Sequence, residues 1–157
     1  MRTRPMTDSD VSRAMEIARG LPEVPHWTEA AYRAAMDPDG QPQRMALVAE
    51  DEAGRLTGFA VACLVGDEAE LELICVPAGE QRRGVGRQLL KALLAELGRN
   101  GVTKVLLEAR ASNRAALGLY AALGFERSGV RPRYYDDPQE DAVLMALRTA
   151  EISRGTQ

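Results

Sequence analysis

Residues 69–90 read AELELICVPAGEQRRGVGRQLL, and their pattern changes twice along the stretch. Glu70 and Glu72 first alternate with Leu71 and Leu73, and residues 74–76 are then apolar on both faces. Such a pattern is typical of a strand that is half exposed at one end and buried at the other. A glycine-containing loop and a leucine-rich segment follow, so the stretch predicts a strand, a tight loop and a helix.

The helix is expected over residues 84–99, because apolar residues recur there at helical spacing. The residues that form this apolar face are Leu89, Leu90, Leu93, Leu94 and Leu97. Asn100 and Gly101 follow, which suits a left-handed helix C-cap. The next apolar run, TKVLLEA at 103–109, predicts a second strand. A strand–helix–strand crossover from 70 to 109 joins two parallel strands.

The rest of the chain fits around this unit as a mixed α/β (α+β) fold. Helices are expected from residue 11, over 29–36 and over 113–123, and strands over 44–50, 55–65, 125–130 and 141–147. With a further strand before the first helix, the order is βααβββαβαββ. This order predicts a mostly antiparallel sheet of about seven strands with flanking helices. We expect one domain over residues 1–148 and a polar tail over 149–157.

Composition excludes several classes of function. The net charge is −3, so a basic face for nucleic acid is not expected. Apolar runs stop short of the ~18 residues that a membrane helix needs, and no apolar signal region begins the chain, so we expect a cytoplasmic protein. The single histidine, His26, argues against a His-rich metal site, and we expect no metal. Cys63 and Cys75 lie in apolar runs and are interpreted as reduced core residues.

The loop before the leucine-rich helix is a candidate phosphate site. Gly84 and Gly86 have no Cβ, so a ligand can approach the backbone closely. The N–H groups of residues 82–87 lie at a helix start, where unpaired donors and the helix dipole favour a phosphate. The alternative is a tight turn with solvated arginines, and the glycines alone do not decide between the two.

Glu108 and Tyr120 are candidates for an acid/base pair. Strand alternation places Glu108 on a face with Leu106, where partial desolvation makes a carboxylate a better base near neutral pH. Tyr120 carries a phenol with a pKa near 10, which can donate a proton. The alternatives are an ion pair of Glu108 with Arg110 or Arg114, and a core role for Tyr120. Asn113 shares a helix face with Tyr120 and is either an N-cap or a ligand contact.

The segment Gln81-Arg82-Arg83-Gly84-Val85-Gly86 between a strand and an amphipathic helix resembles the Q/R-x-x-G-x-G/A motif of the GNAT acetyltransferase superfamily. The resemblance implies the GNAT fold, with a splayed parallel strand pair, and acetyl-CoA as cosubstrate. Its pyrophosphate would bind the loop, and its pantetheine arm would bind the backbone of the preceding strand. The cofactor-binding positions implied are Ile74, Cys75, Val76, Arg82, Arg83, Gly84, Val85, Gly86, Arg87 and Asn113.

Two further segments, LEARASNRAALGLYAALGF (107–125) and RPRYYDDPQEDAVLMAL (131–147), resemble the ribosomal-protein-alanine N-acetyltransferases within that superfamily. This resemblance implies Glu108 as general base, Tyr120 as the acid that protonates the coenzyme A sulfur, and the N-terminus of a ribosomal protein as acceptor. Glu70 is the second candidate base, because some histone-type relatives carry theirs on that strand. Acceptors of another kind, a lysine side chain or a small amine, remain open, as does a non-catalytic acetyl-CoA sensor.

The chain departs from the subfamily pattern at three places. Pro77 follows Val76 directly, Leu73 stands where asparagine is frequent, and the N-terminal loop reads Val-Pro-His-Trp-Thr at 24–28. The first two concern loop geometry and the third concerns the acceptor.

Aromatic and acidic residues are candidates for the acceptor side. A peptide groove would use Trp27, Tyr32, Tyr134 and Tyr135, and ordinary packing is the alternative. The acidic residues Asp136, Asp137, Glu140 and Asp141 would attract a basic peptide or form a solvated loop. His26 is expected to be a minor contact, and the sequence does not indicate an oligomeric state.

Overall fold

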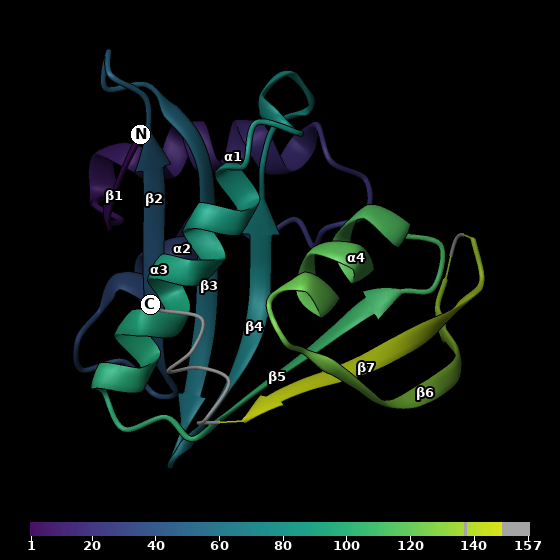
Figure 1. Cartoon of the computed structure of the whole chain (residues 1–157). Helices are drawn as coiled ribbons and strands as arrows, with labels where there is room; N and C mark the ends of the chain where they lie inside the picture. The colour runs from purple at the N-terminus through teal and green to yellow at the C-terminus, as the bar shows by residue number, and fades with distance from the viewer. Residues whose placement is uncertain (137, 149–157) are drawn as a thin grey trace.

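A single seven-stranded sheet runs through the protein in the order β1-β2-β3-β4-β5-β7-β6 (Figure 1). The structure is a computed structural model and describes residues 1–136 and 138–148. The strands are β1 (Arg2–Pro5), β2 (Gln43–Glu50), β3 (Leu56–Val65), β4 (Glu68–Cys75), β5 (Lys104–Arg110), β6 (Glu126–Tyr135) and β7 (Glu140–Arg148). The helices are α1 (Val11–Arg19), α2 (Glu29–Met36), α3 (Val85–Arg99) and α4 (Arg114–Ala122), with short 3-10 turns at Asp8–Asp10 and Ala78–Glu80. The expected element order is confirmed; β6 is longer than expected and includes Tyr134 and Tyr135, which the sequence placed in a loop.

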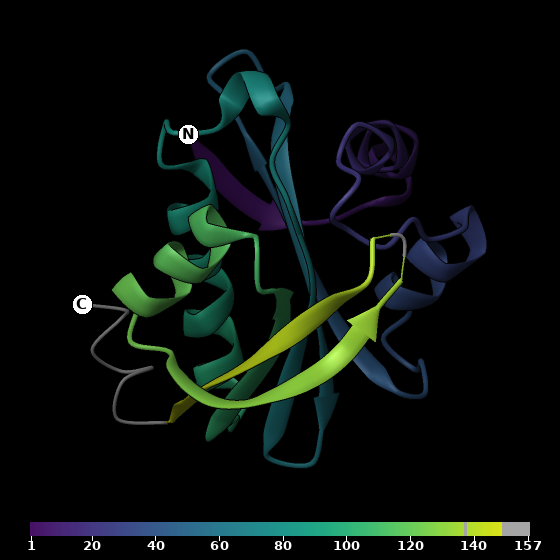
Figure 2. The same cartoon turned by 90° about the vertical axis from the view of Figure 1, so that its right-hand side faces the viewer.

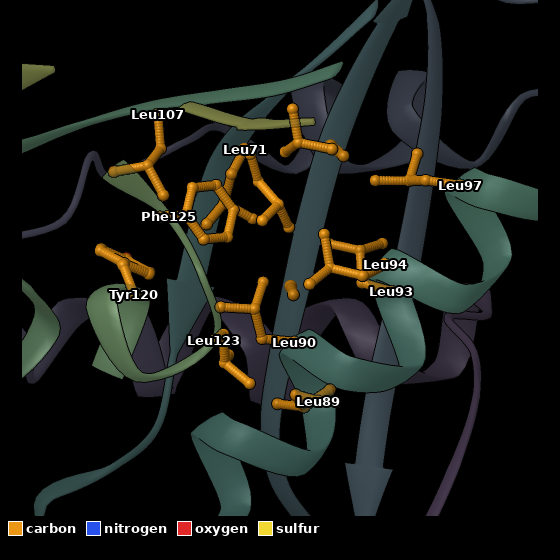
Figure 3. Packing of buried hydrophobic residues seen from close by; sticks show 14 of the residues in the cluster. Leu71, Leu89, Leu90, Leu93, Leu94, Leu97, Leu107, Tyr120, Leu123 and Phe125 are labelled. Atoms are coloured by element: carbon orange, nitrogen blue, oxygen red, sulfur yellow. The ribbon is translucent and has the colours of Figure 1, made fainter. Parts of the chain in front are cut away.

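Helices cover both faces of the sheet (Figure 2). The face that carries α3 and α4 is here called the α3–α4 face, and the opposite one the α1–α2 face. The leucines of α3 point into the core of the α3–α4 face (Figure 3), where Leu89, Leu90 and Leu94 are 0% exposed. Tyr32 and Phe59 belong to a second core, between the sheet and the helices α1 and α2. The amphipathic pattern of α3 is therefore explained by burial of one helix face.

The parallel pair of strands is joined over only a short length. The register of β4 and β5 runs from Glu68 opposite Lys104 to Glu70 opposite Leu106. Beyond that point β5 continues along β7, while β4 continues along β3. The two parallel strands therefore diverge, as Figure 1 shows, and the expected splayed pair is confirmed.

A β-bulge on β4 changes which face each side chain occupies. Val61 on β3 pairs with Leu73 and Ala62 pairs with Leu71, so Glu72 is an extra residue between them. Leu71 consequently packs in the core of the α3–α4 face and Leu73 in that of the α1–α2 face. Simple alternation, which placed both leucines on one face, was wrong here because a bulge adds one residue and shifts the period by one.

Three further expectations concern the chain as a whole. The proposed tail, 149–157, lies outside the described residues, and the sheet spans Arg2 to Arg148. Neither cysteine forms a disulfide; Cys75 is buried and Cys63 is only partly so. Among the described helices, none has the length and apolarity to span a bilayer.

Candidate active site

The divergence of β4 and β5 opens a cavity of about 690 Å³ through the sheet. Its wall combines the two diverging strands, the loop before α3 with the start of that helix, one side of α4, the loop before α2 and the end of β6. The predicted site residues that line it are Trp27, Ile74, Val76, Arg82, Gly84, Val85, Gly86, Glu108, Asn113, Tyr120, Tyr134 and Tyr135. A volume of this size suits a small-molecule ligand or cosubstrate.

The loop before α3 has the geometry of an anion site. Gly84 is the N-cap of α3 with φ +79°, and Arg82 also has a positive φ of 67°. The N–H of Gln88 donates to the Gly84 carbonyl at 3.0 Å, so the N–H groups of residues 85–87 precede the helical ladder. Backbone donors and the positive end of the helix dipole therefore meet at the cavity wall.

Not every residue of this loop contributes its side chain. The cavity lining includes Arg82 but neither Arg83 nor Arg87. The Arg83 guanidinium lies 3.7 Å from the Glu80 carboxylate and is 71% exposed. Gln81 donates through Nε2 to the Val76 carbonyl at 2.9 Å, which fastens the loop to the end of β4. Arg83 and Arg87 are thus placed to offer backbone donors or a distant charge, and their side chains do not form the wall.

Cys75 is placed differently from its neighbours on β4. Ile74 and Val76 line the cavity, whereas Cys75 is 0% exposed and packs in the core of the α1–α2 face. Burial raises the pKa of its thiol to about 12. Cys75 is therefore a protonated core thiol at neutral pH and can reach a ligand only through its backbone.

Glu108 projects from β5 on the face opposite the α3–α4 core. Val105, Leu107 and Ala109 belong to that core, so the expected alternation is confirmed. The Glu108 side chain is 20% exposed, and its Oε1 lies 3.2 Å from Nη2 of Arg131 on β6. The alternative of an ion pair with a nearby arginine thus holds with another partner than those considered, and Arg110 pairs with Glu140 and stacks on Tyr135. Glu108 is thus a carboxylate at the cavity wall with one half-exposed cation beside it.

The two other carboxylates near Glu108 differ in their partners. Glu72 is held by Arg44, with Nε–Oε1 and Nη2–Oε2 distances of 2.7 and 3.4 Å. Burial, followed by the charges of Glu108 and Glu72, raises the pKa of Glu70. Glu70 pairs in register with Leu106 and therefore shares the Glu108 face. Glu70 remains a second candidate base, while Glu72 is occupied by its ion pair.

Tyr120 reaches the cavity from α4. It is 5% exposed and its ring lies 5.8 Å from that of Phe125. Burial, and then the nearby Cys75 and Tyr135, raises the pKa of its phenol. The group therefore keeps its proton through neutral and moderately alkaline pH, as a proton donor must.

Asn113 caps α4 and also remains a candidate ligand contact. Its Oδ1 accepts from the Ala116 N–H at 3.3 Å, so it is the N-cap of α4. The residue also lines the cavity. With the oxygen used by the cap, the side-chain N–H₂ group is available for a ligand.

Among the aromatic candidates, Tyr32 was placed wrongly. It is 0% exposed, lies between Trp27 and Phe59 at ring distances of 5.6 and 5.8 Å, and does not line the cavity. It is a core residue, because the i, i+3 spacing of α2 turns Tyr32 and Ala35 towards the sheet. Trp27, Tyr134 and Tyr135 do line the cavity, and His26 lies within hydrogen-bonding distance of the Leu21 carbonyl.

Two carboxylates of the acidic segment accept hydrogen bonds from backbone N–H groups of the protein. Glu140 accepts from the Ser112 N–H at 2.7 Å and Asp141 accepts from the Arg133 N–H at 2.9 Å. Glu140 therefore joins the start of β7 to the segment between β5 and α4, Asp141 joins β7 to β6, and neither residue lines the cavity. Asp137 lies outside the described residues.

Two functional candidates, Arg131 and Arg44, are not marked by any pattern in the sequence. Both are far in sequence from their carboxylate partners, at separations of 23 and 28 positions along the chain. No local motif marks such pairs, so only the folded sheet brings them together. Within the described residues, no group of three or more His, Cys, Asp or Glu side chains is placed to hold a metal ion.

Comparison with known proteins identifies the family of the chain. The model of the acetyltransferase (GNAT) family matches residues 12–125. The chain therefore belongs to the GNAT family, and its class is that of the N-acetyltransferases.

Two relatives and one solved structure are similar to this chain over most of their length. The [ribosomal protein bS18]-alanine N-acetyltransferase of Escherichia coli K12 is 38% identical over 88% of this chain and 91% of its own. The N-alpha-acetyltransferase RimI of Mycobacterium tuberculosis is 37% identical over 94% of this chain and 92% of its own. The crystal structure of the ribosomal-protein-S18-alanine N-acetyltransferase from Escherichia coli superposes with a TM-score of 0.82 and 34% identity, covering 94% of this chain and 93% of that one.

Proposed function

We propose that this protein transfers the acetyl group of acetyl-CoA to the α-amine of an N-terminal alanine, on a ribosomal protein in the cytoplasm. The observation that carries the proposal is one cavity that joins a helix-start anion site at Gly84–Gly86, a carboxylate at Glu108 and a buried phenol at Tyr120. The similarity to the bS18-alanine N-acetyltransferases over most of both chains supports this acceptor.

In this proposal acetyl-CoA lies between the diverging strands β4 and β5. Its pyrophosphate accepts from the backbone N–H groups of residues 82–87, and its pantetheine arm bonds the backbone of residues 74–76. Ile74 and Val76, which line the cavity, support this placement. The Asn113 amide and the Arg82 side chain add polar contacts from the cavity wall.

The proposed reaction is a direct transfer. The neutral α-amine attacks the thioester carbon, the N–C bond forms and the C–S bond breaks. Glu108 takes the proton that the amine loses, directly or through a water, and Tyr120 gives its proton to the departing thiolate. An α-amine has a pKa of about 8, so a carboxylate suffices as base. Cys75, a protonated thiol inside the core, speaks against an acetyl-cysteine intermediate.

The first test measures free-thiol release from acetyl-CoA together with mass spectrometry of the acceptor. The acceptors are peptides that begin with Ala and carry an internal Lys, with the N-terminus either free or blocked. Acetylation of the free peptides alone supports the proposal. Equal labelling of both would identify a lysine acetyltransferase, and no transfer with acetyl-CoA still bound would identify a sensor or a small-amine enzyme.

Three variants assign the roles within the site. Glu108→Gln is expected to lower kcat by about 10²- to 10⁴-fold, the range of general base catalysis. Tyr120→Phe is expected to lower kcat while the acetyl-CoA KM stays unchanged, because the ring packing is preserved. Glu70→Gln is the matched control for charge, and a larger loss in Glu70→Gln than in Glu108→Gln would move the base to β4.

A further inference from the structure

Trp27 is held between two side chains on the α1–α2 face. The ring centroids of Trp27 and Tyr32 are 5.6 Å apart, and the guanidinium carbon of Arg44 lies 5.5 Å from the centroid of the Trp27 ring. Tyr32 is wholly buried, so it is a fixed support. Trp27 itself lines the cavity. Trp27 is therefore an aromatic part of the cavity wall, and its contacts with Tyr32 and Arg44 set its position.

Arg44 is in turn fixed by Glu72. The pair has two contacts, at 2.7 and 3.4 Å, and both side chains are 22% exposed. A two-pronged guanidinium–carboxylate pair fixes orientation as well as distance. Partial shielding from solvent makes the pair stronger than a surface ion pair.

The register of three neighbouring strands explains this contact. Arg44 on β2 lies opposite Cys63 on β3, and Cys63 lies opposite Glu70 on β4. The Arg44 side chain therefore spans β3 to meet the extra residue of β4, Glu72. Residues i and i+2 of a strand share a face, so Glu72 lies on the same face as Glu70, towards Arg44 and Trp27. The Glu72–Arg44 ion pair thus links the sheet to Trp27 in the loop that precedes α2.

Glu108 and Glu70 lie on the same face of the sheet as this cluster. An amine that reaches Glu108 must approach from the α1–α2 face, and the groups attached to it then pass the Trp27 wall. Arg44 is not among the cavity-lining residues. Its two contacts Trp27 and Glu72 do line the cavity, so an effect of Arg44 on the acceptor acts through these side chains, and the Trp27 fluorescence isolates the part that acts through Trp27.

We propose that the Glu72–Arg44 pair holds Trp27 as the wall against which the first residues of the acceptor peptide pack, so that Arg44 is a positioning residue for acceptor selection. The inference rests on the proposed function, since it needs a peptide acceptor at Glu108. It adds residues of β2 and β4 that lie outside the acid/base pair and the anion loop.

The experiment uses Trp27 as its own probe, because it is the single tryptophan of the chain. Arg44→Met removes the charge and keeps the length, and Glu72→Gln removes the partner charge and keeps the size. In both variants the Trp27 emission is expected to shift to the red and acrylamide quenching to increase. The acceptor-peptide KM is expected to rise about three- to ten-fold, the size of a lost cation–π contact, while the acetyl-CoA KM stays unchanged.

Two further variants make the test specific. Arg13→Met removes an arginine from an exposed ion pair with Glu16 on α1 and is expected to change neither fluorescence nor KM. The double variant Arg44→Met with Glu72→Gln is expected to match Arg44→Met alone, because the two residues act in series. A thermal melt verifies that each variant is folded, and Glu72→Gln carries the test if Arg44→Met does not fold.

Two results would overturn the inference. Unchanged emission and quenching in both single variants would show that the pair does not hold Trp27. Changed fluorescence with an unchanged peptide KM would show that Trp27 is not the acceptor wall. Failure of the proposed function is distinct, because the wild-type enzyme would then acetylate no peptide while the fluorescence comparison still reports on the wall.

Discussion

Replacing Gly86 with alanine separates a structural role of the anion loop from a ligand-binding one. Gly86 is the second residue of α3 and lines the cavity. A Cβ at this position would lie 3.4 Å from Cδ2 of Leu119 and 3.8 Å from Cγ2 of Val76. Both are ordinary van der Waals distances, so the fold has room for a methyl group.

Gly86→Ala is therefore expected to maintain or raise the free energy of unfolding and to lower the affinity for acetyl-CoA. Alanine is favoured over glycine in a helix by about 0.5–1 kcal/mol, so Gly86→Ala is expected to leave the free energy of unfolding unchanged or raise it by up to that amount. The same methyl stands between cavity-lining residues and holds a phosphate away from the N–H groups of the first turn. Losing one hydrogen bond to a charged group costs about 1.5–3 kcal/mol. Acetyl-CoA affinity is thus expected to fall about ten- to hundred-fold.

The assay is isothermal titration with acetyl-CoA, with a thermal melt of the same samples. Gly118→Ala is the matched control: Gly118 lies inside α4, and a Cβ there would meet nothing within 4 Å. It is expected to gain the helix stabilisation and to keep wild-type affinity. If Gly86→Ala is as stable as predicted and binds acetyl-CoA within two-fold of wild type, the loop is a tight turn and the phosphate assignment is wrong.

Two changes outside the acid/base pair test the surrounding structure. The Tyr32 hydroxyl is buried with no hydrogen-bond partner among the described residues. Tyr32→Phe is therefore expected to raise the free energy of unfolding by about 1 kcal/mol and to leave the peptide KM unchanged. A loss of stability in urea unfolding would contradict this prediction. The Asp10 carboxylate accepts from the Arg4 guanidinium at 2.8 Å, and this contact is the main cause that lowers the pKa of Asp10. Because the folded pKa is depressed, the stabilisation is present above the unfolded pKa and is lost as pH falls through the folded value. Asp10→Asn is expected to cost about 2–3 kcal/mol at pH 7, and an equal cost at pH 7 and pH 2 would refute the assignment.

Much of the fold and part of the site follow from local sequence. The leucines of α3 and the alternation of β5 each specify their own element, because burial of one face needs only a repeat of 3.6 or 2 residues. Alternation also determined that Glu108 leaves β5 on the side away from Leu107. The two glycines at the start of α3 indicated where the helix begins, and the N-cap Gly84 indeed has a left-handed φ that suits glycine.

Contacts between distant strands could not be derived in the same way. The sequence determined that Glu70, Glu72 and Glu108 are carboxylates on two neighbouring strands. Only the tertiary structure decided that Arg131 lies beside Glu108 and that Arg44 holds Glu72, since the paired residues come from different strands of one sheet. The bulge at Glu72 is the clearest case: one extra residue reverses the faces of the side chains that follow it. Periodicity specifies an element from its own residues, whereas register and bulges depend on the partner strand, and the partner exists only once the chain has folded.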